Sequence, residues 1–303
     1  MDKIVSIIKP NGMTSHDVVS VVRKTLNMKK VGHTGTLDPD ASGVLPICLG
    51  KATKVSELIL NKDKAYICEL TLGLITDTYD TSGEILERCE DFELTKEQIK
   101  EAFKTQLGEI DQFPPIYSAL KVNGRKMCDL ARSGKADQIE LKSRRINIKK
   151  LDILSINKDK VSFYVECSKG TYVRSICYDI GKILGVGGCM SNLIRVKSGK
   201  FNMDNSISIE DLKKHKEENT LDKYIYDIEF VLSDFNTLVL HENAVRYYKN
   251  GGSILDDRFI EKTFNDNDEI VRVYDNEKNF IGSGKLLRKD NTISVKTDKI
   301  FVV

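Results

Sequence analysis

The feature that most constrains the fold is a strict alternation of apolar and polar residues near the middle of the chain. From Val161 to Ser168, apolar residues occupy the odd positions and more polar residues the even ones. A period of two is typical of a β-strand with one buried and one exposed face. Residues 64–74 predict another such strand, with four residues sharing one face: Tyr66, Cys68, Leu70 and Leu72.

Helix signals lie between these strands without a regular rhythm. Ser15 can cap a helix that runs to about residue 27, and Thr95 with Gln98 forms a capping box for another. Thr171 is expected to cap a third helix. Because strands and helices do not alternate as in a parallel βαβ fold, the pattern predicts an α+β fold with a mixed, largely antiparallel sheet.

The pattern of apolar and turn-forming residues changes near residue 235. Beyond this point, short apolar runs are separated by turn signals rich in glycine and asparagine. The expected turns lie at 250–252, 275–276, 282–284 and Asp290-Asn291. The sequence therefore predicts two domains, a larger one over residues 1–235 and a small β-rich one over residues 236–303.

Composition argues against several classes of protein. The seven cysteines are scattered and include no C-x-x-C pair, so we expect buried free thiols rather than disulfides or zinc ligands. The four histidines form no H-x-x-x-H pair, and we expect no metal. No apolar run reaches the roughly 20 residues that a membrane helix needs. Without a signal-peptide pattern at its N-terminus, the chain is expected to be cytoplasmic.

A net charge of +2 conceals an uneven distribution. Residues 114–150 hold ten Lys or Arg against three Asp or Glu, and residues 168–200 hold six against one. Residues 87–111 are the reverse, with eight acids and four bases. The two basic stretches suit a nucleic-acid backbone, because neutralising phosphates releases counterions. On charge alone, a solvated lysine-rich surface is the simpler explanation.

Asp38 lies in a glycine-rich loop, VGHTGTLDPDASG, at residues 31–43. Pro39 fixes its own φ and restricts Asp38 to extended conformations, so the loop is expected to be ordered. A rigid loop that displays a carboxylate is a suitable place for chemistry. Taken by itself, however, an Asp before a Pro is more often simply a turn residue.

Several blocks of sequence stand in the order of one known family. One block centres on Gly35-Thr36-Leu37-Asp38-Pro39 and extends from Lys9-Pro10 to Leu45-Pro46. The later blocks are Lys64-Ala65-Tyr66, Thr76-Asp77-Thr78 with Asp80 and Gly83, Tyr117 to Lys121, Cys167 to Arg174, and Leu193 ahead of Arg195. Together, over about residues 3–200, they resemble the bacterial tRNA pseudouridine-55 synthase (TruB) family. Residues 293–296 resemble the closing strand of a PUA-type RNA-binding module.

The resemblance implies an enzyme that isomerises uridine 55 in the T-loop of tRNA and needs no cofactor. Asp38 is implied as the nucleophile, Arg174 as its ion-pair partner, and Tyr66 as the residue that stacks on the base and helps move a proton. The further substrate contacts are His33, Tyr172, Leu193 and Lys9. These roles suit the residue types, because an ionised Asp can attack as a nucleophile and an Arg favours its charged form.

The target base lies inside the folded T-loop, so it must be flipped out into an aromatic and apolar slot. By the same resemblance, residues 114–150 are an insertion that grips the tRNA elbow. Its candidate phosphate contacts are Lys121, Arg125, Lys126, Arg132, Arg144 and Arg145. The implied fold is a pseudouridine synthase catalytic domain followed by a PUA-like domain. No protein partner is expected, and the chain is taken as a monomer.

Three other hypotheses stay open. Archaeal and eukaryotic relatives act on RNA selected by a guide RNA and partner proteins, but this chain carries no long basic tail, which favours a stand-alone enzyme. A non-catalytic RNA chaperone would not need Asp38. A hydrolase built on the carboxylates of Asp38 and Asp40 is a third alternative, although no other residue resembles its general acid.

Overall fold

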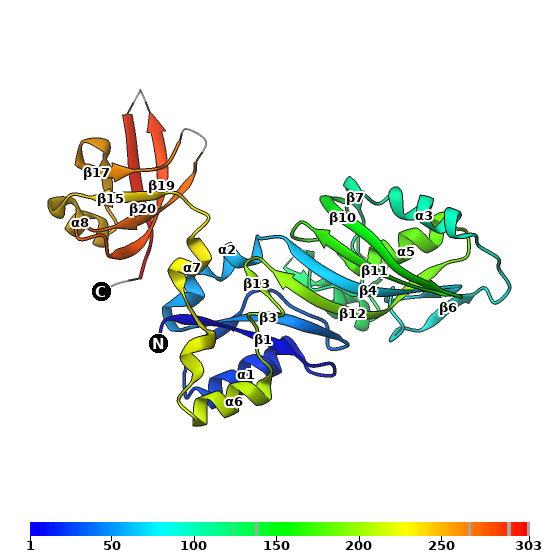
Figure 1. Cartoon of the computed structure of the whole chain (residues 1–303). Coiled ribbons are helices and arrows are strands. Elements are labelled where there is room, and N and C mark those ends of the chain that lie inside the picture. The colour runs from blue at the N-terminus through cyan, green and yellow to red at the C-terminus, as the bar shows by residue number, and fades with distance from the viewer. Residues whose placement is uncertain (123, 137–138, 266–267, 290–291, 302–303) are drawn as a thin grey trace.

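The computed structural model describes the chain in five stretches: residues 1–122, 124–136, 139–265, 268–289 and 292–301. Within them the molecule is elongated, and a small sheet stands apart from a large one (Figure 1). The predicted α+β fold, with a largely antiparallel sheet and a small β-rich part at the C-terminal end, is confirmed. No helix in the described stretches is long and apolar enough to cross a membrane.

The strands of the large sheet are β1 Lys3–Lys9, β2 Val31–His33, β3 Ala41–Leu49, β4 Lys64–Leu72, β7 Gly108–Gln112, β10 Arg144–Asn157, β11 Lys160–Cys167, β12 Gly188–Ser198, β13 Phe201–Asn202 and β14 Ile225–Asp227. Their spatial order is β14-β1-β3-β12-β4-β11-β10-β7, while β2 pairs with β3 and β13 with β12. All pairs are antiparallel except β3 with β12. This one parallel pair joins segments that are far apart in the sequence.

The helices associated with this sheet are α1 Ser15–Thr25, α2 Ser56–Leu60, α3 Lys96–Lys104, α5 Val173–Ile183, α6 Ile209–Glu217 and α7 Ile228–Leu232. The two strands predicted from alternation, β4 and β11, are neighbours in the sheet. Their apolar faces and the buried faces of α3 and α5 form the main core. The predicted capping box of Thr95 and Gln98 opens α3. The alternation therefore identified the strands on which the core is built.

Two helix starts differ from the prediction by one residue. Thr14, not Ser15, caps α1, because Thr14 and Asp17 form a reciprocal capping box. The first residue outside α5 is Tyr172, which makes no side-chain cap. Thr171 does not cap this helix, because its hydroxyl donates to the carbonyl three residues before it (3.0 Å).

The small sheet is built from β15 Thr237–Leu240, β16 Ser253–Leu255, β17 Phe259–Lys262, β18 Ile270–Tyr274, β19 Phe280–Lys289 and β20 Thr292–Ile300, with α8 Glu242–Lys249 packed on it. The strand order is β16-β20-β19-β18-β15-β17. This sheet has a core of its own, in which Tyr248 of α8 is fully buried and its hydroxyl donates to the carbonyl of Ser283 (2.8 Å).

The turns expected at 250–252 and 275–276 are present. The turn expected at 282–284 is wrong, because both glycines lie inside β19. A Cβ on Gly282 would stand only 2.2 Å from the carbonyl oxygen of Lys299, so glycine is needed there for close packing of strands. The turn expected at Asp290-Asn291 lies outside the described residues.

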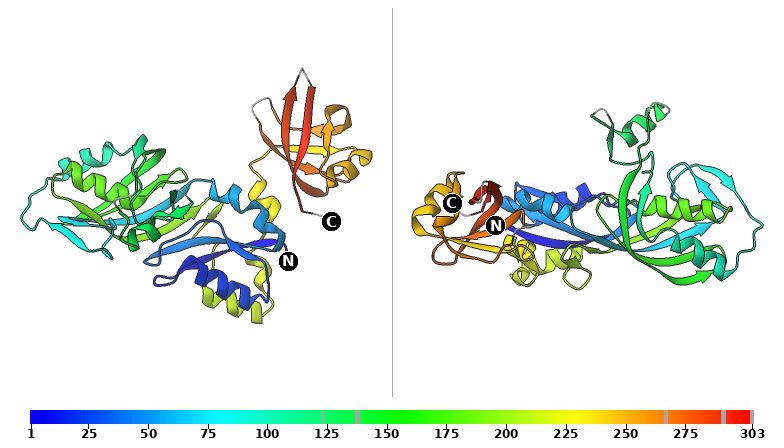
Figure 2. Two further views of the ribbon diagram at one scale, coloured as in Figure 1. Left: turned by 180° about the vertical axis from the view of Figure 1, so that it is seen from behind. Right: turned by 90° about the horizontal axis from the view of Figure 1, so that it is seen from above.

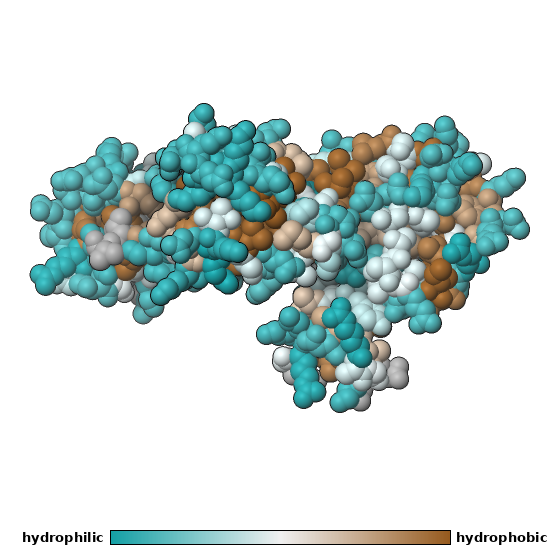
Figure 3. All heavy atoms as spheres, turned by 90° about the horizontal axis from the view of Figure 1, so that it is seen from below, coloured by the Kyte–Doolittle hydropathy of each residue, from teal (hydrophilic) through white to brown (hydrophobic). Residues whose placement is uncertain are grey.

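Two short strand pairs and one helix lie outside these two sheets: β5 Leu74–Thr76 with β6 Ile85–Arg88, and β8 Lys121–Val122 with β9 Arg125–Lys126 and α4 Met127–Arg132. The second group belongs to the predicted insertion, which leaves the large sheet after β7 and returns in β10. It stands out from the body of the molecule (Figure 2), and hydrophilic side chains cover much of its surface in Figure 3.

Candidate active site

The loop between β2 and β3 carries Asp38 and is held from several sides. The Ser15 hydroxyl lies 3.1 Å from the carbonyl oxygen of Leu37 and accepts from the N–H of the same residue at 2.9 Å. The Lys9 ammonium donates to the carbonyl of Pro39 (3.1 Å). The loop is thus ordered, as expected from its proline.

Arg195 of β12 holds the same loop from the protein interior. It is 1% exposed and donates to the carbonyls of Val44 (2.7 Å), Gly35 (3.1 Å) and Thr36 (3.4 Å). In the sequence this arginine stands out only as a neighbour of Leu193, and it has no predicted role. The available signal was its spacing, because residues two apart in a strand share one face.

Arg174, in the first turn of α5, bridges two carboxylates. Its Nη2 lies 3.0 Å from Oδ2 of Asp38, and its Nη1 lies 3.3 Å from Oδ2 of Asp80. It also donates to the carbonyls of Thr78 (3.2 Å) and Tyr117 (3.1 Å). The ion pair between Arg174 and Asp38 that the resemblance implied is therefore present, and the guanidinium is fixed by four oxygen atoms.

Asp80 is the partner of Arg174 to which the sequence prediction gave no role. Its Oδ1 accepts from the hydroxyls of Thr78 (2.7 Å) and Ser82 (2.6 Å). The Asp80 side chain is 16% exposed, whereas that of Asp38 is 43% exposed. Asp80 is thus a fixed counterion, and Asp38 is the carboxylate that remains accessible.

A pocket of about 530 Å³ opens beside Asp38. Most of the predicted site residues line it: Asp38, Tyr66, Arg144, Arg145, Tyr172, Arg174 and Leu193. Residues without a predicted role also line it, among them Lys64, Ser118, Lys169 and Arg195. Blocks that are distant in the sequence therefore converge on one cavity.

Tyr66 of β4 forms part of the pocket and is 8% exposed. Burial raises the pKa of its phenol to about 12, although a hydrogen bond with Arg195 acts in the opposite direction. The phenol therefore stays protonated at neutral pH.

Lys64 begins the same strand and is also buried. Its ammonium donates to the carbonyls of Leu60 (2.7 Å) and Lys62 (2.8 Å). Burial, together with the nearby charge of Arg195, lowers the pKa of Lys64 to about 8. The pocket wall thus contains a cation that is weakly solvated.

Tyr172 and Leu193 provide an aromatic and an apolar wall. The N–H of Tyr172 donates to the side-chain oxygen of Gln112 (2.8 Å), and its carbonyl accepts from the amide nitrogen of the same side chain (3.1 Å). Burial raises the pKa of the Tyr172 phenol, and a hydrogen bond with Ser118 opposes this shift. Leu193 of β12 is buried opposite Cys68 of β4.

His33 lies at the end of β2, next to the Asp38 loop, and is not among the residues that line the pocket. Its Nδ1 accepts from the N–H of Gly35 (3.3 Å), and its ring meets that of His16 edge-on, with 6.0 Å between centroids. Burial, followed by the charges of His16 and Arg195, lowers the pKa of His33. The imidazole is therefore neutral at neutral pH.

The position of Lys9 requires a correction. It was predicted to contact the substrate, but its side chain is fully buried and does not line the pocket. Its ammonium donates to three carbonyls, those of Pro10 (2.9 Å), Met13 (2.6 Å) and Pro39 (3.1 Å). These bonds use all three of its donors, so Lys9 supports the Asp38 loop and has none left for RNA.

The basic residues of the insertion fall into two groups. Lys121, Arg125 and Lys126 are exposed on the β8–β9 hairpin and lie outside the pocket wall. Arg144 and Arg145, at the start of β10, reach the pocket. Arg145 is already paired with acids of β7, Glu109 (3.3 Å) and Asp111 (3.2 Å).

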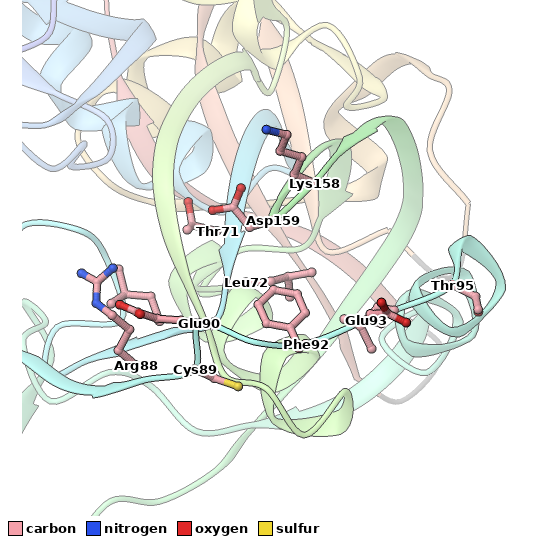
Figure 4. Close-up of a pocket in the computed structure, with 13 residues that line it drawn as sticks. Thr71, Leu72, Arg88, Cys89, Glu90, Phe92, Glu93, Thr95, Lys158 and Asp159 are labelled. Atoms are coloured by element: carbon pink, nitrogen blue, oxygen red, sulfur yellow. The ribbon is translucent and has the colours of Figure 1, made fainter.

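A second hollow, of about 820 Å³, lies at the far end of β4 (Figure 4). Leu72 and Phe92 form its apolar part, and charged side chains such as Arg88, Glu90 and Asp159 surround it. None of the predicted site residues lines it. Its larger volume therefore does not make it the better candidate for the active site.

All seven cysteines are free thiols, as predicted, and only Cys89 and Cys128 are partly exposed. Among the described residues, no three His, Cys, Asp or Glu side chains gather in a way that could hold a metal ion.

The sequence matches two protein-family models. Residues 23–173 match the TruB family pseudouridylate synthase (N terminal domain), and residues 174–233 match the tRNA pseudouridylate synthase B C-terminal domain. Over 302 residues, the full length of both proteins, the chain is 66% identical to the tRNA pseudouridine synthase B of Clostridioides difficile (strain 630). The chain belongs to the TruB family. The resemblance seen in the sequence, and the enzyme class of pseudouridine synthase that it implied, are confirmed.

Further relatives of this TruB-family enzyme extend the comparison. It is 47% identical over 302 residues to the tRNA pseudouridine synthase B of Clostridium kluyveri, again over the full length of both chains. Its structure resembles that in a Cbf5-Nop10-Gar1 complex, with a TM-score of 0.77 and 28% identity over 99% of this chain and 85% of that chain. A similar match is an H/ACA RNP bound to a substrate RNA containing 2′-deoxyuridine, with a TM-score of 0.75, 26% identity, and 99% and 85% coverage.

Proposed function

We propose that this enzyme converts uridine 55 in the T-loop of tRNA to pseudouridine, with Asp38 as the nucleophile. The observation that carries the proposal is the 3.0 Å ion pair between Arg174 and Asp38 beside a pocket lined by Tyr66, Tyr172 and Leu193. Full-length relatives named tRNA pseudouridine synthase B support tRNA as the substrate.

The reaction is an isomerisation, which suits a site made of protein side chains alone. The N1–C1′ bond of uridine breaks and a C5–C1′ bond forms, while C5 loses a proton and N1 gains one. Atoms and electrons balance without an oxidant or an energy source. Asp38 forms the covalent intermediate, and Arg174 pairs with its carboxylate and fixes its position.

The flipped base enters between Tyr66, Tyr172 and Leu193. Stacking on an aromatic ring is worth about 1–3 kcal/mol, which offsets part of the few kcal/mol that unstacking costs. Because the phenol of Tyr66 has a pKa of about 12, it acts by stacking and as a hydrogen-bond donor rather than as a phenolate base.

The RNA backbone is held mainly by charge. The exposed cations of the insertion, Lys121, Arg125, Lys126, Arg132 and Arg144, contact phosphates and position the tRNA without reading its sequence. The small sheet, residues 236–303, is a PUA-like domain that adds to RNA binding. We further propose that the enzyme works in the cytoplasm, as a monomer and without a protein partner; cell fractionation and sedimentation of the enzyme with tRNA test these points.

Pseudouridine mapping on unmodified tRNA transcript tests the proposal directly. Wild-type protein should modify uridine 55 alone, and Asp38→Asn should bind the transcript but lose activity by at least about 10⁴-fold. Asp40→Asn is the matched control, because this neighbouring carboxylate is exposed and does not line the pocket, and it should keep the wild-type rate.

Each failure has its own meaning. An active Asp38→Asn variant would remove Asp38 as the nucleophile. Modification of a different uridine would refute the substrate assignment. A wild-type protein that binds tRNA and changes no uridine would point to a guide-dependent enzyme or an RNA chaperone.

A further inference from the structure

Tyr79 has an unusual backbone conformation. Its φ is +63°, in the left-handed region, although it is neither glycine nor asparagine. A bulky residue is rare there, because its Cβ crowds the backbone, and the conformation persists only where the surroundings impose it. Tyr79 directly precedes Asp80, the fixed counterion of Arg174.

The Tyr79 ring is held by a second aromatic residue. It stacks on the ring of Tyr178, with 4.1 Å between centroids and 13° between planes. Tyr178 lies in α5, four residues after Arg174 and therefore one turn further along the same side of the helix. The stack thus fastens the segment before Asp80 to the helix that carries Arg174.

The backbone around Tyr79 is anchored to β12 as well. The carbonyl of Tyr79 accepts from the N–H of Met190 (2.9 Å), and the N–H of Thr81 donates to the carbonyl of Met190 (2.9 Å). Asp80 lies between these two bonds, so its backbone is held by β12 while its side chain pairs with Arg174 of α5. A change at Tyr79 is therefore expected to move Asp80.

We propose that the stacked pair of Tyr79 and Tyr178 positions Asp80 against Arg174 and so sets the reactivity of Asp38. Neither tyrosine lines the pocket, so the pair acts through Asp80 and Arg174 and is a positioning device, not part of the catalytic machinery. The inference rests on the proposed function, because it assigns Asp38 the attacking role.

Single-turnover rates and tRNA affinities of two variants test the proposal. Tyr79→Phe keeps the stack and should retain the wild-type rate. Tyr79→Asn removes the ring but is tolerated at positive φ. It should lower the single-turnover rate about ten- to hundredfold, as expected for a small misplacement of reacting groups. Its Kd for the tRNA transcript should not change, whereas general loosening of the fold would weaken binding too.

A double-mutant cycle with Asp80→Asn separates positioning from a merely structural effect. If Tyr79 acts through Asp80, adding Tyr79→Asn to Asp80→Asn should cost little further rate. Independent, multiplying losses would overturn the proposal, and so would a full rate in Tyr79→Asn.

Tyr178→Leu removes the other ring of the stack, on α5, and should lower the single-turnover rate to the same extent as Tyr79→Asn. This variant tests the proposal if Tyr79→Asn does not fold. A full rate in Tyr178→Leu overturns the proposal. The wild-type rate is measured first: an inactive wild type refutes the proposed function, whereas an active wild type with fully active stack variants refutes only the stack.

Discussion

The active-site pocket and the insertion are both rich in Lys and Arg, but the cations of the two regions have opposite surroundings. In the pocket, Arg174 and Arg195 are buried, and each donates to several oxygen atoms. In the insertion, Lys121, Arg125 and Lys126 are exposed, and within the described part of the chain no side-chain hydrogen bond or ion pair holds them. The pocket cations are thus fixed before substrate arrives, whereas those of the insertion can adapt to it.

A positive charge can therefore contribute in two ways, to the chemical step or to RNA affinity, depending on its surroundings. A buried and fully bonded cation costs no reorganisation during the reaction, so it contributes to the chemical step. A solvated cation contributes through counterion release, which depends on salt and needs little geometry. Variants of the buried pocket cations should therefore change rate or stability, and variants of the exposed cations should change affinity.

Among the cation variants, the largest effect is expected for Arg174→Lys. A lysine keeps the charge but cannot hold both Asp38 and Asp80 with a planar fork of donors. Single-turnover rates should fall about 10²- to 10³-fold, comparable to the loss of one preorganised donor, while tRNA binding stays unchanged. A rate close to that of the wild type would show that charge alone is sufficient. It would contradict the idea that the pocket cations act through their fixed geometry.

Stability should depend on pH through Lys64. Its pKa is about 8 in the folded protein, below the ordinary 10.5, so between these values the unfolded chain holds a proton that the folded protein has released. The free energy of unfolding should therefore rise with pH in this window, by roughly 2–3 kcal/mol between pH 8 and 10, and be flat below pH 8. Lys64→Met should abolish the rise.

Urea unfolding at pH 7, 8, 9 and 10 measures this dependence. The difference between wild type and Lys64→Met isolates the contribution of Lys64 from that of other groups. Lys121→Met, which removes an exposed lysine of the insertion, is the control. Equal pH profiles for wild type and Lys64→Met would contradict the prediction.

A smaller loss, in stability, is expected for Arg195→Lys. The lysine cannot satisfy the carbonyls of Val44, Gly35 and Thr36 together, so the free energy of unfolding should fall by about 2 kcal/mol. Arg125→Lys in the insertion should change it by less than about 0.5 kcal/mol. Urea denaturation of both variants decides the point, and equal stabilities would mean that burial of Arg195 contributes nothing.

The smallest effect separates two neighbouring arginines. Arg144→Gln should weaken tRNA binding about fivefold at 0.15 M salt and reduce the salt dependence by about one phosphate contact. Arg145→Gln should weaken binding less, because Glu109 and Asp111 already neutralise its charge. Affinity measured over a salt series tests both, and a larger loss in Arg145→Gln would reverse the assignment.

Periodicity was enough to identify β4 and β11, because a half-buried strand shows its two faces directly in the sequence. Predictions of turns and helix caps from neighbouring residues failed where a contact with another part of the fold determined the conformation. Gly282 looks like a turn residue, but the neighbouring strand requires a glycine inside β19. Thr171 looks like a helix cap, but its hydroxyl bonds to a preceding carbonyl instead.

In the candidate active site, too, some residues could be predicted from the sequence and others depend on contacts with distant segments. The pocket residues Asp38 and Arg174 were identified because their blocks resemble a family, not because charge or spacing singled them out. Lys9 was misassigned because the residues next to it in the sequence do not reveal that its ammonium is buried and bonded to three carbonyls. Arg195 and Asp80 were missed for the same reason, since their partners lie on other elements.

The parallel pairing of β3 with β12 has a consequence for biosynthesis. Arg195 bonds to a loop residue that precedes it by 160 positions. At about 5–20 residues per second, the ribosome needs roughly ten to thirty seconds to make this intervening chain. During that time Asp38 has been synthesised, but the strand that supports its loop has not. The nascent chain therefore carries the Asp38 carboxylate early and completes the pocket late. Under the proposed function, unfinished chains hold the carboxylate without the ability to use it.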